Sequence, residues 1–233
     1  MRAHCLQHEA FEDMGAIMPW LTEHNFDISY SLFFKSDTLP SLDEFDWLII
    51  MGGSMSVNDE KEYKWLGREK EFIRQCINAG KVVIGICLGS QLIASSLGTR
   101  VFKNKEKEIG WFPVYKNNNI KSLLTRKFPE EITAFHWHGE TFDLPGEAEL
   151  IAGSEACKNQ IFTIGNKVLG MQCHLETTSQ SLAELSSNCR NELIPSEFIQ
   201  SEEDIIKKGI VFYTKMHKVL YDILDELLEY GIL

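Results

Sequence analysis

Two short, continuously apolar segments place the strongest constraint on the fold of this chain. They read WLIIM at 47–51 and VVIGI at 82–86, and each runs directly into a glycine-containing turn. Central strands of a parallel sheet are buried on both faces, so they lack the alternation of apolar and polar residues of a half-exposed strand. We predict that both segments are central parallel strands whose carboxyl ends open onto one crevice.

Helical patterns separate these strands across the first hundred residues. We expect further strands at 2–7 and 28–32, and helices at 14–21, 60–78 and 88–97. Short β-branched runs that alternate with helices are typical of α/β proteins with a parallel sheet. The predicted fold is therefore a doubly wound, mainly parallel sheet with flanking helices.

The second half of the chain is richer in short strands, with glycine, proline and asparagine turns between them. Strands are expected near 111–115, 132–135, 150–152, 161–164 and 168–172. The charges alternate in sign over 103–108, which favours a solvated loop. Helical patterns return from 177 and again over 204–230. We predict one domain over 1–233 with a helical extension from about 201.

Composition and charge exclude several classes of function. The 34 acidic residues outnumber the 23 lysines and arginines, giving a net charge of -11, which disfavours nucleic acid and anionic membranes as partners. No stretch approaches the roughly 20 apolar residues of a membrane span, and the N-terminus does not resemble a secretory signal. The six cysteines form no Cys-x-x-Cys pair, so we expect a reduced, cytoplasmic setting.

The segment GICLGSQ at 85–91 carries the strongest local signal. It has the form of a nucleophile elbow, a sharp strand-to-helix turn in which the residues two before and two after the nucleophile approach closely. Gly85 and Gly89 stand at these two places, where glycine relieves the clash. Cys87 would lie at a helix N-terminus, where partial positive charge favours the thiolate. The alternative is an ordinary buried thiol in a tight turn.

A histidine and a glutamate that could serve such a thiolate follow in GMQCHLE at 170–176. A thiolate nucleophile needs an imidazole as its base, and the imidazole needs an acceptor on its second nitrogen. Residues i and i+2 of a strand lie on the same side, so His174 and Glu176 can meet. For an isolated His-x-Glu, a surface histidine beside an ordinary acidic residue is the plainer interpretation.

Together these segments resemble the class I glutamine amidotransferase family, the triad glutaminases. The likeness covers most of residues 1 to 190 and extends to MGGSMSV at 51–57 and EIGW at 108–111. It is closest to the glutaminase domain of GMP synthetase and its free-standing relatives. The resemblance implies a flavodoxin-like core and a site that uses no cofactor.

The resemblance also implies roles for individual residues. Cys87, His174 and Glu176 would form the triad, and the backbone amides of Gly53 and Leu88 would form the oxyanion hole. Where the family has a Ser-His-Gly-Asp loop that holds the substrate's α-amino and carboxylate groups, this chain has WHGE at 137–140. The implied substrate-binding residues are Gly52, Gln91, Trp137 and His138.

A metal site is the less favoured interpretation of two nearby histidines. His136 and His138 could place both imidazoles on one face of a strand. A site needs at least a third ligand, and no further donor stands at an informative spacing. We therefore expect no metal.

The expected reaction is cleavage of the γ-amide of glutamine through a γ-glutamyl thioester, releasing ammonia and glutamate. Residues 177–233 are too few for a synthetase domain and no Walker-type phosphate loop is present, so the ammonia acceptor would be a separate synthase subunit. A stand-alone γ-glutamyl hydrolase or peptidase is the alternative. A non-catalytic interaction module is a remote one, because every triad member is present. A homodimer stays open.

Overall fold

The computed structural model describes residues 1–120 and 122–231. Its strands are β1 (Arg2–Gln7), β2 (Asp27–Leu32), β3 (Trp47–Ile50), β4 (Val82–Ile86), β5 (Val101–Lys116), β6 (Glu131–Phe142), β7 (Glu149–Gly153), β8 (Ile161–Ile164) and β9 (Val168–Met171). Its α-helices are α1 (Ile17–Glu23), α2 (Leu66–Asn78), α3 (Leu88–Ser96), α4 (Ser179–Cys189) and α5 (Glu202–Gly231). Three short 3-10 turns lie at Leu42–Glu44, Leu123–Thr125 and Arg190–Glu192.

The predicted α/β class is confirmed, with a mixed sheet of nine strands in the order β2-β1-β3-β4-β9-β8-β7-β5-β6. Every pairing from β2 to β9 is parallel, whereas every pairing from β9 to β6 is antiparallel. The antiparallel half contains the strands predicted after residue 100, but the two expected at 111–115 and 132–135 are longer than predicted, with 16 residues in β5 and 12 in β6. The sheet is thus parallel around the strand that precedes Cys87 and antiparallel from β9 to β6.

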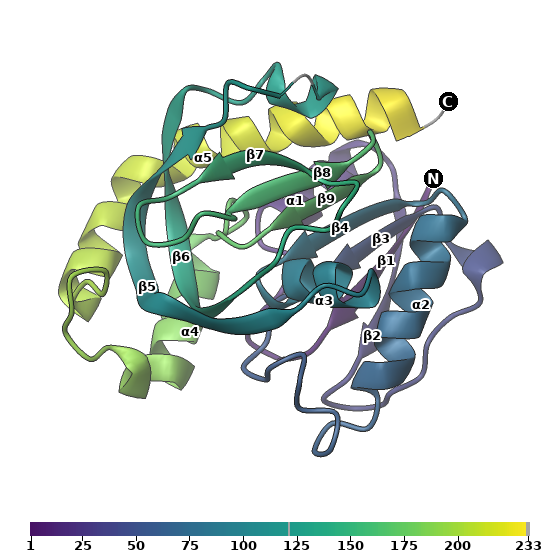
Figure 1. Cartoon of the computed structure of the whole chain (residues 1–233), viewed down its shortest axis with the longest axis horizontal. Helices are drawn as coiled ribbons and strands as arrows, with labels where there is room; N and C mark the ends of the chain where they lie inside the picture. The colour runs from purple at the N-terminus through teal and green to yellow at the C-terminus, as the bar shows by residue number, and fades with distance from the viewer. Residues whose placement is uncertain (121, 232–233) are drawn as a thin grey trace.

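Helices cover both faces of the sheet (Figure 1). Trp47 and Ile49 of β3 pack into the core beneath α1, α4 and α5, while Leu48 and Ile50 pack into the core beneath α2 and α3. All four side chains are at most 2 % exposed. The continuously apolar strand is therefore explained by burial on both faces, as predicted.

Two boundary predictions were wrong. Helix α2 begins at Leu66, because the amides of Glu62 and Tyr63 both bond to the carbonyl of Asp59 and close turns instead. The predicted solvated loop at 103–108 is part of strand β5, and its last residue, Glu108, is 1 % exposed. The register between β5 and β6 shifts over this stretch, and Glu108 is the first residue after the shift that pairs with β6, opposite His138.

The predicted C-terminal helix is α5, which packs along the face that also carries α1 and α4 (Figure 1). Its apolar stripe is core, since Leu220, Ile223, Leu224 and Leu227 are at most 1 % exposed. Within the described residues, no helix combines the length and apolar character required to cross a membrane.

Candidate active site

The loops at the carboxyl ends of the parallel strands border a cavity of about 390 Å³. Seven of the nine predicted site residues line it, namely Gly53, Cys87, Leu88, Gln91, Trp137, His138 and His174. Glu176 lies behind His174, away from the cavity, as an orienting residue should. Gly52 does not line the cavity either, so its contact with a substrate stays a prediction. The predicted common crevice is therefore present.

Cys87 occupies a strained position between β4 and α3. Its φ of 49° and ψ of -107° are rare for a residue with a side chain. A Cβ at Gly85 would lie 2.5 Å from the backbone of Gly89, and a Cβ at Gly89 would lie 2.1 Å from the carbonyl oxygen of Ile50. Glycine at both places is thus a steric requirement of this turn. The strain is typical of residues held in place for function.

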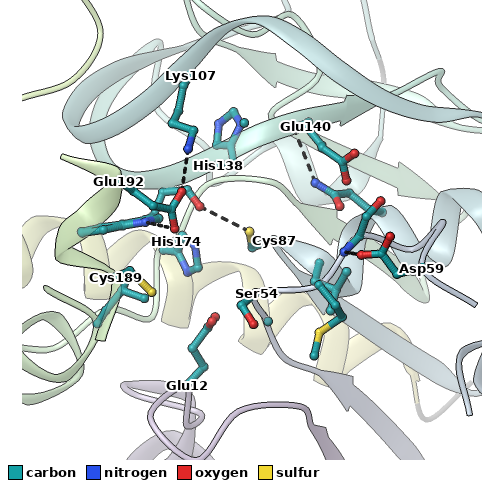
Figure 2. A pocket seen from close by; sticks show the side chains of 18 of the residues that line it. Glu12, Ser54, Asp59, Cys87, Lys107, His138, Glu140, His174, Cys189 and Glu192 are labelled. Atoms are coloured by element: carbon teal, nitrogen blue, oxygen red, sulfur yellow. Dashed lines mark hydrogen bonds and ion pairs between the residues drawn. The ribbon is translucent and has the colours of Figure 1, made fainter. Parts of the chain in front are cut away.

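His174 lies beside Cys87 (Figure 2) and is paired with Glu176. Its Nδ1 lies 2.7 Å from Oε1 of Glu176, both side chains are 6 % exposed, and its amide bonds to the carbonyl of Phe135. Burial disfavours the imidazolium, but the Glu176 carboxylate and the contact with Cys87 outweigh burial and raise the pKa of His174 well above its usual value. The arrangement can hold an imidazolium against a thiolate.

Two glutamines form a chain of amides that ends at the sulfur, and the sequence analysis assigned no role to the second. Gln91 Nε2 donates to Gln172 Oε1 at 3.0 Å, and Gln172 Nε2 donates to Cys87 Sγ at 3.5 Å. On its other side, the thiol donates to the carbonyl oxygen of Trp137 at 3.7 Å. Gln172 lies two residues before His174. Residues two apart on an extended chain share a side, so this spacing is the sequence signal that could have placed Gln172 near Cys87.

His8, at the end of β1, is a second residue that the sequence analysis missed. Its Nε2 lies 2.8 Å from Oε1 of Glu69, and its Nδ1 lies 3.1 Å and 3.0 Å from the carbonyl oxygens of Met51 and Gly52. All three partners are acceptors, so both ring nitrogens must donate, and His8 is an imidazolium. Burial opposes this charge, but Glu69 outweighs it and raises the pKa of His8.

This buried ion pair fixes the loop that carries the predicted oxyanion amide. The His8 ring stacks at 5.3 Å on Phe33 and at 5.5 Å on Trp65. Because His8 hydrogen-bonds to the carbonyl oxygens of Met51 and Gly52, it fixes the orientation of the peptide that joins Gly52 to Gly53. Ser54 ties the same loop to Glu9 through a hydrogen bond from its hydroxyl.

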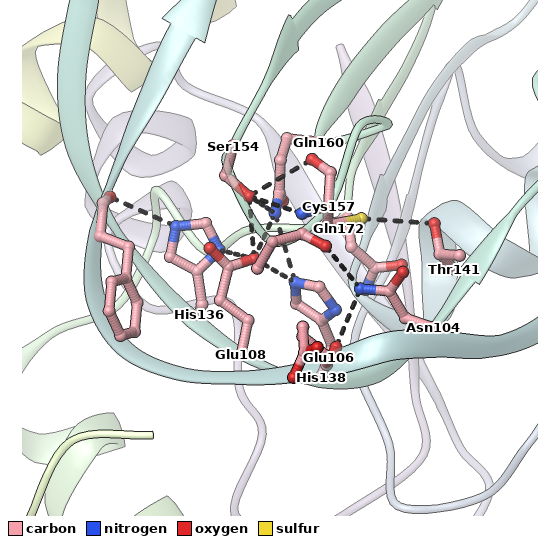
Figure 3. Close-up of polar contacts among 12 residues, drawn as sticks. Asn104, Glu106, Glu108, His136, His138, Thr141, Ser154, Cys157, Gln160 and Gln172 are labelled. Carbon is pink, nitrogen blue, oxygen red and sulfur yellow. Dashed lines mark hydrogen bonds and ion pairs between the residues drawn. The ribbon is translucent and has the colours of Figure 1, made fainter. Parts of the chain in front are cut away.

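The predicted pocket residue His138 belongs to a buried polar cluster that includes Glu108 (Figure 3). Oε2 of Glu108 lies 3.2 Å from His138 Nε2 and 3.4 Å from His136 Nδ1, and it accepts hydrogen bonds from Ser154 and Gln160. Burial raises the pKa of Glu108, but the neighbouring histidines and the hydrogen bond from Ser154 outweigh burial and lower the pKa below its usual value, so the carboxyl is ionised. Burial lowers the pKa of His136 to about 4, so this ring is neutral.

The cluster supplies the third donor that the sequence analysis did not find. Glu108, His136 and His138 offer three atoms within 4.8 Å of one another, a set that could hold a metal ion. The same carboxylate oxygen is already satisfied by the hydrogen bonds from Ser154 and Gln160. These contacts form a hydrogen-bonded network that fixes β6, the strand that carries the WHGE segment.

Comparison with known proteins identifies the family. The family model for class I glutamine amidotransferases matches residues 21–191. The chain is 35% identical over 232 residues to the glutamine amidotransferase-like protein YfeJ of Salmonella typhimurium, covering 97% of each chain. A glutamine amidotransferase structure from Thermotoga maritima superimposes with a TM-score of 0.89 at 29% identity, covering 98% of each chain.

Two more distant relatives differ in the activity that their names state. A glutamine-hydrolyzing GMP synthase component of Picrophilus torridus is 28% identical over 162 residues, covering 69% of this chain and 82% of its own. Gamma-glutamyl peptidase 3 of Arabidopsis thaliana is 26% identical over 164 residues, covering 67% and 65%. From the match to the family model and the similarity along nearly its whole length, the chain belongs to the class I glutamine amidotransferase family.

Proposed function

We propose that this protein is a glutaminase-type hydrolase that cleaves the γ-amide of glutamine or of a γ-glutamyl compound. One observation carries the proposal: Cys87 stands on a strained turn in a cavity, beside a histidine that a carboxylate holds at 2.7 Å. A merely structural thiol needs neither the strain nor the oriented imidazole.

The proposed cycle begins with attack of the Cys87 thiolate on the amide carbon. The negative charge on the carbonyl oxygen is received by the amides of Gly53 and Leu88, the latter at the first position of α3, where an N–H has no partner within the helix. The imidazolium of His174 gives its proton to the departing amine, and a γ-glutamyl thioester remains. Neutral His174 then takes a proton from water, which releases glutamate.

The test measures glutamate release and covalent labelling by a chloroketone analogue of glutamine. We expect labelling at Cys87 and turnover that Cys87→Ala abolishes, while circular dichroism shows that the variant is folded. Cys189 lines the same cavity, so Cys189→Ala is the matched control and should keep both signals. Labelling at another residue, or turnover retained by Cys87→Ala, would eliminate this mechanism. Neither labelling nor turnover in the wild type would favour a non-catalytic module.

A stand-alone γ-glutamyl hydrolase is the second candidate, favoured by the size of the cavity. Its volume of about 390 Å³ lies within the range of roughly 300–1,000 Å³ that is usual for ligands larger than an amino acid. Turnover of a γ-glutamyl amine or peptide well above glutamine would support this candidate. Labelling of Cys87 with little turnover of any substrate would instead indicate an amidotransferase that awaits an ammonia-accepting synthase subunit. We place either enzyme in the cytoplasm, where its free cysteines stay reduced.

A further inference from the structure

Cys87 divides the cavity into two sides, one of which carries His174. Figure 2 shows one side with Glu12, Cys189 and Glu192 next to His174, and the opposite side with Glu140 and Asp59. Because the histidine must protonate the departing amine, the leaving group lies on the His174 side. This assignment rests on the proposed function.

Glu12, from the loop between β1 and α1, reaches the reacting groups from this side. The position that a Cβ on Gly52 would occupy lies 1.9 Å from Oε2 of Glu12 and 3.7 Å from Cβ of Cys87. Because Gly52 has no side chain at this position, the Glu12 carboxyl can lie next to the nucleophile. Glu12 also borders a small adjoining cavity of about 20 Å³, which His174 and Leu185 share.

The Glu12 carboxyl is half-buried beside the nucleophile, and no hydrogen bond or ion pair reaches it from the described residues. Desolvation raises its pKa to about 7, although His174 and His8, each of which is paired with another glutamate, oppose the rise. A desolvated carboxyl without a partner is costly when ionised, and a cation placed against it removes that cost. A leaving group that carries a negative charge would make ionisation of the Glu12 carboxyl still more costly.

The other charges of this side are already compensated. Lys107 Nζ lies 2.7 Å from Oε2 of Glu192, and Oε1 of Glu192 also accepts from Trp137 Nε1 at 3.3 Å. The remaining lysine of the cavity, Lys103, pairs in strand register with Glu140, on the opposite side. The uncompensated charge beside the leaving group is thus negative.

We propose that the leaving-group side binds an amine that carries a second positive charge, and that Glu12 recognises this charge. The substrate class is a mono-γ-glutamylated diamine. In the reaction, the C–N bond breaks as Cys87 forms the thioester, the free diamine leaves with the proton from His174, and water releases glutamate. A γ-glutamyl amino acid would bring its carboxylate against Glu12 and is disfavoured.

The experiment compares substrates that differ only in the terminal charge of one four-carbon amine. They are γ-glutamyl-1,4-diaminobutane, γ-glutamyl-butylamine and γ-glutamyl-4-aminobutyrate, with glutamine as reference. For the wild type we expect kcat/KM to fall about tenfold or more from the cationic to the neutral compound, and further to the anionic one. Glu12→Gln should bring the ratio of kcat/KM between the cationic and the neutral compound close to one. The exposed Glu155, outside the cavity, gives the control Glu155→Gln, which should keep the preference.

Binding to Cys87→Ala, measured by calorimetry, gives a readout that does not depend on turnover and should show the same order. An equal loss on all compounds in Glu12→Gln, a preference for the anionic compound, or no binding of the diamine compound would overturn the inference. If Cys87 is labelled and glutamine is cleaved without any charge preference, the proposed function survives and only this inference fails. If Cys87 is neither labelled nor required for turnover, both fail.

Discussion

Replacing Glu69 by glutamine removes one charge from a buried ion pair that holds the loop after β3. Glu69 and His8 are both fully buried, at 0 % exposure, and their atoms are 2.8 Å apart. Glutamine keeps the shape of the side chain but leaves the His8 imidazolium without a counterion. The ring must then either stay charged in the interior or lose a proton and, with it, one of its hydrogen bonds.

The expected cost follows from this burial. Removing one partner of a buried pair typically destabilises a protein by about 3–5 kcal/mol. For a chain of this length each kcal/mol lowers the melting temperature by about 2–4 °C, so we expect a decrease of about 6–20 °C. The control is Glu60→Gln, which breaks the exposed pair with Lys70 and should cost at most about 1 kcal/mol.

Urea unfolding followed by circular dichroism measures both variants against the wild type. A loss of less than about 1 kcal/mol in Glu69→Gln, no larger than in Glu60→Gln, would refute the charged state assigned to His8. Because the pair also aims the Gly53 amide, Glu69→Gln should lower the rate of acylation of Cys87 in the protein that remains folded.

The same pair predicts a dependence on pH. The pKa of His8 is raised in the folded state, so its contribution is fully present below the unfolded value of about 6.5 and is lost as pH rises through the folded pKa. The difference in stability between the wild type and Glu69→Gln should therefore be larger at pH 6 than at pH 9. A difference that widens toward pH 9 would contradict the assignment.

Three further predictions concern the turn, the sulfur and the buried cluster. Gly89→Ala forces a Cβ against the carbonyl of Ile50 and should cost about 1–3 kcal/mol or more in urea unfolding, whereas Gly146→Ala, which meets no atom within 4 Å, should be near neutral. Gln172→Ala removes the donor to the sulfur and should lower kcat about tenfold with little change in KM; an unchanged kcat would show that the contact is incidental. Glu108→Gln should cost about 1.5–3 kcal/mol by thermal unfolding, and a neutral result would mean that the cluster is not charged.

The nucleophile turn could be predicted from the sequence because its requirements are local. A strand-to-helix turn of this kind leaves no room for a side chain two residues before or two residues after the nucleophile. A Cβ at Gly85 or Gly89 would lie only 2.5 Å or 2.1 Å from neighbouring backbone atoms. The pairing of His174 with Glu176 was likewise predictable, since residues two apart on an extended chain share a side.

The missed residues all act across large separations in sequence. His8 meets Glu69 and the loop after β3 only because β1 pairs with β3, and the sequence analysis had no reason to bring these segments together. Glu108 was assigned to a solvated loop from the alternating charges around it. It is instead buried against His136 and His138 of β6, and that strand pairing is not recorded in any local pattern.

By itself, the sequence determined the α/β class, the two central strands, the strained cysteine turn and the His-x-Glu pair, because hydrophobic periodicity and turn sterics act over a few neighbouring residues. The tertiary structure alone decided which charges are buried and how they are compensated. It turned Glu12 toward the nucleophile, enclosed His8 with Glu69 and brought Glu108 under the histidines. The energy of a charge depends on the dielectric and the partners that surround it, and these are set by residues distant along the chain.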